Sequence, residues 1–174
     1  MNIMGIDLSF NHLGWVLLTD DPTNEKHKLS LNKKGEWVLK KPNLYSLTEK
    51  LVMINDHLYE AIMLCEPDII ILEETYVGPN AKTTAGLNSA KGIVMLLAKQ
   101  FTECDPILVN AAKVRACLGL KDKQAVFDHF RRIYKLPKDF KKWNDITDAI
   151  ALAYYYYFYI NDLCKEKSRK KKKK

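Results

Sequence analysis

The sequence predicts a mixed α/β fold, in which a five-stranded sheet is flanked by helices. Three strand-type segments follow one another in the N-terminal part, joined by polar residues, a pattern typical of an antiparallel meander. After them, segments with the 3.6-residue period of amphipathic helices alternate with short apolar segments that are typical of parallel strands. A chain of 174 residues is long enough to form one such domain around a buried core.

The first predicted element is a β-hairpin over Asn2–Trp15. An apolar run leads into a single carboxylate, Asp7, and a polar turn over Ser9–His12 separates it from a second apolar run that begins at Gly14. A carboxylate in so apolar a strand is costly to bury unless it is paired or binds a cation. Taken alone, Asp7 is explained more simply as a solvated side chain at a strand end.

The remaining elements follow from the hydrophobic period and from the positions of Gly and Pro. Asn144 is a good N-cap for the last helix. The predicted elements after the hairpin are, in order, a loop over Asp20–Lys34, a strand over Glu36–Lys40, a helix over Leu44–Leu64, a strand over Asp68–Glu74, a loop over Thr75–Gly86, a helix over Leu87–Phe101, a strand over Pro106–Val109, and helices over Ala111–Leu118, Asp122–Tyr134 and Asn144–Leu163.

Basic residues are concentrated in two segments of the chain. There are 28 Lys and Arg against 21 Asp and Glu, but Lys165–Lys174 alone holds eight basic residues and one acid, so the rest is formally neutral. Within that rest, Lys113–Lys142 has ten basic and three acidic residues. The layout indicates a polyanionic partner, with a solvated helix face and a disordered tail as the alternative. We expect one domain over 1–164 and a basic, disordered tail over 165–174.

Composition argues against several other classes of protein. No apolar run approaches the about 20 residues of a membrane span, and the N-terminus has no leader-like segment, so we expect a cytoplasmic protein without membrane contact. The cysteines are widely spaced and form no CxxC pair, which argues against a zinc site or a disulfide framework.

Four carboxylates stand where the predicted fold would gather them. Glu73 ends the apolar strand, and Asp145 and Asp148 lie three residues apart on one helix face. If the first and fourth strands are neighbours, Asp7 and Glu73 project together, and a helix packed across that edge adds the other two. Four carboxylates repel one another without cations, and oxygen ligands suit Mg²⁺ or Mn²⁺. Taken alone, acids in the first turns of a helix also stabilise its N-terminus.

Five segments carry a resemblance to a known family: GIDLSFNHLGW, PDIIILEETY, NSAKG, KDKQAVFDHFRRIYKLP and NDITDAIALA. Their order and flanks resemble the RuvC-type Holliday-junction resolvases of the RNase H-like superfamily, and they cover nearly the whole chain except the tail. The resemblance implies an RNase H-like fold and a Mg²⁺-dependent endodeoxyribonuclease that resolves four-way junctions by symmetric paired nicks. The opening segment also resembles the RuvC-like domains of CRISPR effector nucleases. Whether the source is a bacterium, a phage or another virus stays open.

The resemblance also implies roles for the four acids. Asp7 would bridge two Mg²⁺ ions, which Mn²⁺ would replace, and Glu73 would hold one ion and help to place the attacking water. Asp145 and Asp148 would complete the coordination shells, and the product would carry a 5′-phosphate and a 3′-hydroxyl. Glu74 stands where the family usually has a neutral residue, so we leave it out of the site.

Four further residues match DNA-contact positions of the family. Tyr76 falls at an aromatic position beyond the catalytic Glu and would stack on or wedge a base. Lys123 matches a lysine near the scissile phosphate, Lys113 matches a second one loosely, and Lys91 falls on a basic position. Each of these lysines, taken alone, is more simply a solvated surface residue. In the family the helix predicted over Leu87–Phe101 lies at a two-fold interface, so we expect a homodimer.

Two other functions are open to a sequence of this kind. The hairpin GIDLSFNHLGW also resembles the phosphate hairpin of an actin or sugar-kinase-like ATP-binding domain, but that fold normally needs two lobes. A basic nucleic-acid-binding module without catalysis is the other, and it leaves the four ordered acids unexplained. The composition of the loop Val77–Thr84 departs from the family, which leaves the preference for junctions or forks open.

Overall fold

A computed structural model describes residues 1–23, 28–74, 81–102 and 104–160. Its sheet has five strands in the order β3-β2-β1-β4-β5. The predicted mixed sheet is confirmed, because β1 pairs antiparallel with β2 and parallel with β4. The strands are β1 (Asn2–Leu8), β2 (His12–Asp20), β3 (Leu29–Val38), β4 (Ile69–Glu73) and β5 (Ile107–Val109).

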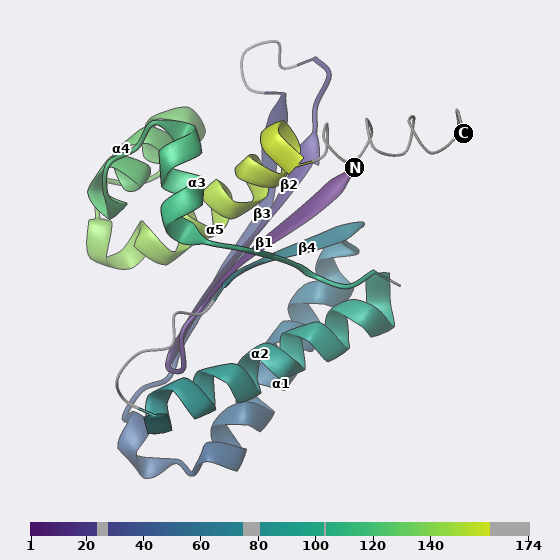
Figure 1. The fold of residues 1–174 in the computed structure, drawn as a ribbon, viewed down its shortest axis with the longest axis vertical. Helices are drawn as coiled ribbons and strands as arrows, with labels where there is room; N and C mark the ends of the chain where they lie inside the picture. The colour runs from purple at the N-terminus through teal and green to yellow at the C-terminus, as the bar shows by residue number, and fades with distance from the viewer. Residues whose placement is uncertain (24–27, 75–80, 103, 161–174) are drawn as a thin grey trace.

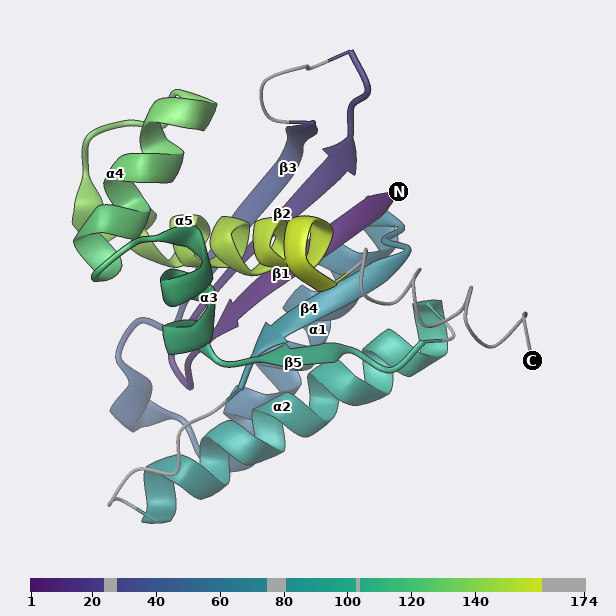
Figure 2. The same ribbon diagram turned by 45° about the horizontal axis from the view of Figure 1, so that its top comes forward.

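Helices cover both faces of the sheet, as Figures 1 and 2 show. One layer contains α1 (Leu47–Cys65) and α2 (Ala81–Thr102), preceded by the short 3₁₀ helix η1 (Pro42–Leu44). The other contains α3 (Ala111–Leu118), α4 (Lys123–Tyr134) and α5 (Phe140–Tyr155), which continues as a π-helical turn, Tyr156–Ile160. None of the helices in the described ranges is long and apolar enough to cross a membrane.

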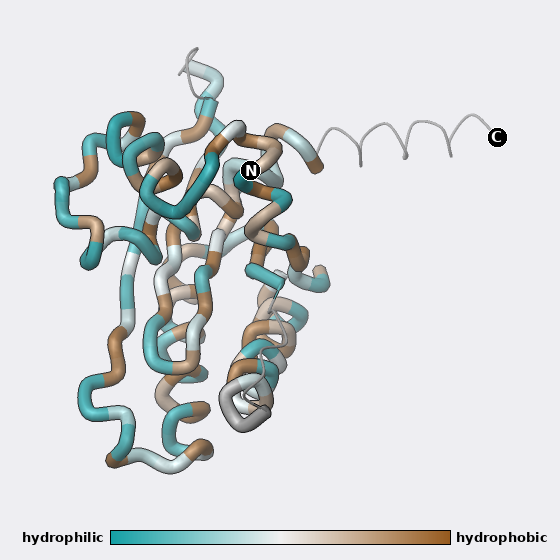
Figure 3. Tube along the Cα trace, turned by 60° about the vertical axis from the view of Figure 1, so that its left-hand side comes forward, coloured by the Kyte–Doolittle hydropathy of each residue, from teal (hydrophilic) through white to brown (hydrophobic). Residues whose placement is uncertain are grey.

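The alternation of side chains along β1 divides the core in two. Met4 and Ile6 are buried against the α1/α2 layer, whereas Ile3 is buried against the α3–α5 layer. Since successive side chains of a strand point to opposite faces, Gly5 and Asp7 share the face of Ile3. In Figure 3, which is coloured by hydropathy, hydrophobic and hydrophilic residues alternate along the helices.

Several predicted boundaries were wrong. Part of the predicted loop Asp20–Lys34 is strand, because β3 begins at Leu29. This strand lies at the edge of the sheet and exposes many polar residues. The alternation of apolar and polar residues that identifies a strand in a sequence is therefore weak in this segment. The long helix begins at Leu47 rather than Leu44, where Ser46 and Glu49 form a capping box.

The starts of two later helices also differ from the prediction. Helix α2 begins at Ala81 inside the predicted loop Thr75–Gly86, and α5 begins at Phe140 with Asp139 as its N-cap. Asn144 therefore lies inside α5 and is not a cap. The predicted loop residues 75–80, the end of the last predicted helix at 161–163, and the tail over 165–174 lie outside the described residues.

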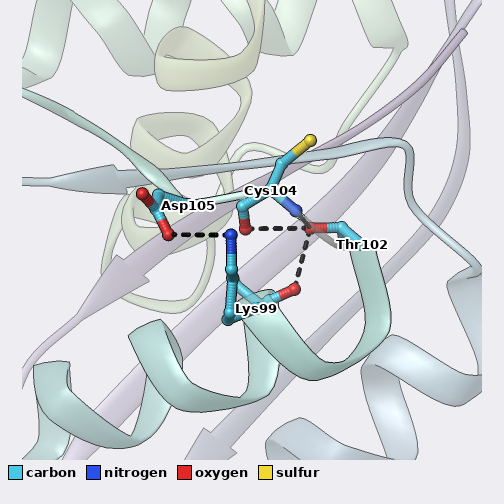
Figure 4. A network of polar contacts seen from close by, with 5 residues as sticks. Lys99, Thr102, Cys104 and Asp105 are labelled. Carbon is cyan, nitrogen blue, oxygen red and sulfur yellow. Dashed lines mark hydrogen bonds and ion pairs between the residues drawn. The ribbon is translucent and has the colours of Figure 1, made fainter.

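The connection from α2 to β5 is fixed by a small polar network (Figure 4). Thr102 Oγ1 donates to the carbonyl of Ala98 at 2.8 Å and accepts from the Cys104 amide at 3.3 Å. Lys99 and Asp105 form an ion pair at 3.6 Å. The network lies at the far end of the sheet from the carboxylates described below, so it supports the fold and not the site.

Candidate metal centre

The four predicted acids meet on the α5 face of the sheet. Asp7 is the last but one residue of β1, and Glu73 is the last residue of β4. The parallel register pairs Ile6 with Leu72, which brings Asp7 and Glu73 side by side one position further along. The charge of Glu73 acts on Asp7, as expected for two carboxylates that lie close together. The condition set from the sequence, that the first and fourth strands be neighbours, is therefore met.

Helix α5 crosses this face closely because two glycines lie beneath it. Gly14 of β2 is paired with Asp7, and a Cβ atom built on Gly14 would lie 2.8–2.9 Å from the main chain and Cβ of Asp145. A Cβ on Gly5 would lie 2.1 Å from the Ala149 carbonyl oxygen. Real Cβ atoms do not approach so closely, so both positions need glycine. The close approach brings Asp145 and Asp148 down to the strand acids.

Burial and mutual repulsion raise the pKa values of three of these acids. The pKa of Asp7 is raised well above its ordinary value by burial, and then by the charges of Asp148, Glu73 and Asp145. Burial also raises the pKa of Glu73 and of Asp148, with a further contribution from a neighbouring acid in each case. The site therefore holds more negative charge than its surroundings balance.

Lys123, at the start of α4, is the cation nearest to the acids. Its Nζ atom lies 2.8 Å from the buried atom Asp148 Oδ2, so the two side chains form an ion pair. Partial burial favours the neutral amine, but the charges of Asp148, Asp7 and Glu73 raise the pKa of Lys123. In return, the charge of Lys123 offsets part of the rise in the pKa values of Asp7, Glu73 and Asp148.

Sequence reasoning missed two residues of this site. Arg115 of α3 lowers the pKa values of both Glu73 and Asp148, so its guanidinium contributes positive charge to the cluster. Its position in the basic segment Lys113–Lys142 was the available signal. Asn144 donates from Nδ2 to Asp145 Oδ1 at 2.7 Å and so orients that carboxylate.

The other predicted DNA contacts lie apart from the acids or outside the described residues. Lys113 is exposed in the first turn of α3, and Lys91 is partly exposed on α2. No interaction between either lysine and the carboxylates is found in the described part of the chain. Tyr76 lies outside the described residues.

The donor set fits a hard divalent cation by its chemistry. All candidate ligands are carboxylate oxygens, which suit Mg²⁺ and Mn²⁺, and the raised pKa values show that added positive charge would be stabilised. Among the described residues, no three Asp, Glu, His or Cys side chains are arranged to hold a metal ion as they stand.

Comparison with known proteins matches this arrangement to one family. The model of the family "Crossover junction endodeoxyribonuclease RuvC" matches residues 3–156. A crossover junction endodeoxyribonuclease RuvC of Rickettsia typhi is 28% identical over 159 residues, which cover 88% of this chain and 95% of that protein. Thermus thermophilus RuvC in complex with a Holliday junction substrate superposes with a TM-score of 0.74 at 20% identity, covering 92% of this chain and 96% of that chain. The yeast mitochondrial Holliday junction resolvase Ydc2 gives a TM-score of 0.58 at 14% identity, covering 87% and 75%.

Proposed function

This chain belongs to the crossover junction endodeoxyribonuclease RuvC family, and we propose from this premise that it is a metal-dependent nuclease that resolves four-way DNA junctions. The observation that carries the proposal is the gathering of Asp7, Glu73, Asp145 and Asp148 at the ends of β1 and β4. Neither an ATP-binding lobe nor a non-catalytic basic module accounts for four acids at one point. We propose that it acts in the cytoplasm of a bacterium or of a phage-infected host cell, in keeping with its bacterial relatives.

The four acids are the proposed ligands of two Mg²⁺ ions, with Mn²⁺ as a substitute. Asp7 lies between Glu73 on one side and α5 on the other, which suits it to bridge two ions. Asn144 would hold Asp145 in its orientation through the contact at 2.7 Å. Bound Mg²⁺ would supply Lewis-acid activation of the attacking water and stabilise the leaving 3′ oxygen, so that the product carries a 5′-phosphate.

The cations of the site are suited to the phosphate. Lys123 lies against the acids and is kept protonated by them, so its ammonium group can pair with a non-bridging phosphate oxygen once it leaves Asp148. Arg115 lies close enough to Glu73 and Asp148 to act on their charges. Lys113 and Lys91 would bind the DNA backbone further from the scissile bond, and Tyr76 would contact a base.

We propose that the active form is a homodimer built on α2. Two active sites related by a two-fold axis are needed to cut opposite strands of a junction symmetrically. On the outer face of α2, Met95 and Leu96 are 44% and 57% exposed, which is unfavourable in a monomer and suits an apolar interface.

The proposed function is tested with synthetic DNA of three shapes. A four-way junction, a fork and a linear duplex of shared sequence are incubated with the full chain, with and without Mg²⁺. The proposal expects paired nicks at symmetric positions near the crossover, only with metal, and little cutting of the duplex. Binding of the junction without any metal-dependent nicks would favour a non-catalytic module instead.

A further inference from the structure

A second recess lies at the same end of the sheet as the acids, on the α1/α2 side. Its volume is about 510 Å³, which is within the range of small-ligand sites. We call it the Phe10–Tyr45 pocket, after the residues Phe10 and Asn11 of the β1–β2 turn, Tyr45 and Lys50 before and within α1, and Gly86 of α2. The mechanism proposed above uses none of these residues.

The ring of Phe10 is a fixed platform in this pocket. A Cβ atom built on Gly86 would lie 3.1 Å from Cε2 and Cζ of Phe10, so the ring packs directly on the main chain of α2. The Nζ atom of Lys50 lies 4.8 Å from the ring centroid. An aromatic ring held in this way, with a cation over it, offers an apolar surface and a positive charge in one place.

The rest of the lining is aromatic, polar and partly apolar. It includes the half-buried ring of Tyr45 and the exposed amide of Asn43. Pro42, Ser46 and Leu47 also line the pocket. Aromatic rings, amides and a lysine together match a nucleotide, which has a flat base, polar edges and a phosphate.

We propose that the Phe10–Tyr45 pocket binds one unpaired nucleotide of the branched DNA, within a few nucleotides of the phosphate that is cut. The base would lie against Tyr45, and against Phe10 once Lys50 moves from over that ring to pair with the phosphate. Phe10 is three residues beyond Asp7, so the pocket begins within about 10 Å of the acids along the chain. That distance corresponds to a few nucleotides of one strand at about 3.4 Å each.

This proposal rests on the proposed function for its substrate, and it assigns base selectivity near the crossover to these residues. A nucleotide reaches the pocket only where the DNA strand is not stacked in a duplex. Junction centres supply such nucleotides, and a linear duplex does not. The pocket would therefore favour branched DNA as well as particular bases at one position.

The test places the fluorescent base 2-aminopurine at successive positions around the crossover of a four-way junction. Full-length protein is added in EDTA, so that binding is measured without cleavage. We expect one position at which the fluorescence changes severalfold on binding. In Tyr45→Ala and Lys50→Gln that change is lost and junction affinity falls about tenfold, the effect of removing one stacking or phosphate contact.

A matched control is Leu44→Ala, since Leu44 neighbours Tyr45 but is 72% exposed and outside the pocket lining. It keeps the wild-type fluorescence change, and melting temperatures confirm that all variants fold. The proposal is overturned if no position responds, or if the variants respond as the wild type does. Equal binding of a free 2-aminopurine deoxynucleotide would also overturn it, by indicating a site for free nucleotides. Because no metal is present, these outcomes do not depend on whether the protein cleaves DNA.

Discussion

Asp7 is paired with Gly14 across the β1–β2 hairpin, and the main chain of Asp145 fills the space that a side chain at Gly14 would need. A second glycine has the same role on β1. Gly5, two residues before Asp7, lies beneath the carbonyl of Ala149, which fills the space that a side chain there would need. The distance between the strand acids and the helix acids is therefore set by the absence of two side chains. This relationship gives the first prediction.

Gly14→Ala should impair cleavage by about 100-fold while leaving a folded protein. The new methyl group would meet atoms of Asp145 at 2.8–2.9 Å, so α5 must move away from β2 and carry two acids with it. Misplacement of catalytic groups by about 1 Å costs about 100-fold in rate. Overpacking of this kind also costs about 1–3 kcal/mol of stability. Cleavage rates at saturating Mg²⁺ and melting temperatures measure the two effects.

Thr48→Ala is the control for stability. Thr48 is exposed in the first turn of α1, outside the proposed dimer helix α2, and alanine is a better helix former than threonine. Its melting temperature should rise slightly. If Gly14→Ala were as stable as this control and cut as fast as the wild type, α5 would not be held at its position by Gly14.

Asp7→Asn should raise the stability of the metal-free protein at neutral pH. The pKa of Asp7 is raised in the folded state, so its contribution to stability is fully present below the unfolded pKa near 3.8 and is lost as pH rises towards the folded value. At neutral pH the buried charge is therefore unfavourable, and asparagine removes it. Each kcal/mol recovered raises the melting temperature by about 2–4 °C in a chain of this size.

Mg²⁺ should reverse the order of stability, so that the wild type becomes more stable than Asp7→Asn. It should stabilise the wild type by about 1 kcal/mol or more when well above its Kd, and Asp7→Asn much less. Asp105→Asn is the control, since Asp105 is exposed and pairs only weakly with Lys99 at 3.6 Å. If the melting temperature of the wild type does not change when Mg²⁺ is added, the assignment of these acids as metal ligands is contradicted.

Lys123→Gln should move the acid limb of the pH–rate profile to higher pH. Lys123 lowers the pKa values of Asp7, Glu73 and Asp148, so removing its charge raises them and delays the ionisation needed for metal binding. The cleavage rate should fall more at about pH 6 than at about pH 9.

Two variants make that pH test specific to the charge of Lys123. Lys123→Arg keeps the charge and should restore most of the profile. Lys121→Gln removes a side chain that is 87% exposed and 3.9 Å from Asp122, and it should leave the profile unchanged. If Lys123→Gln lost the same fraction of the cleavage rate at every pH, Lys123 would contact the phosphate without affecting the ionisation of the acids.

The part of the site that the sequence predicts depends on regular geometry. Alternation along β1 and the spacing of Asp145 and Asp148 follow from strand and helix periods, so the gathering of four acids was predictable. Two assumptions were needed, that β1 and β4 are neighbours and that the last helix packs across their edge. The sheet order confirms the first, and the approach of Asp145 to Gly14 confirms the second.

The parts that the sequence missed depend on tertiary contacts. Arg115 acts on the acids from a different helix, and its place in the basic segment Lys113–Lys142 does not distinguish it from the other basic residues there. Asn144 resembles a helix cap because its side chain suits one, yet here the side chain binds Asp145 inside α5. The Phe10–Tyr45 pocket joins three segments that only the fold brings together.

Whether Asp7 holds catalytic metal ions is measured by comparing the wild type with Asp7→Asn on one four-way junction in Mg²⁺. Binding and cleavage are measured on the same labelled DNA. We expect Asp7→Asn to bind the junction as tightly as the wild type and to make no detectable nicks. Wild-type nicking by Asp7→Asn in Mg²⁺ would contradict this role of Asp7.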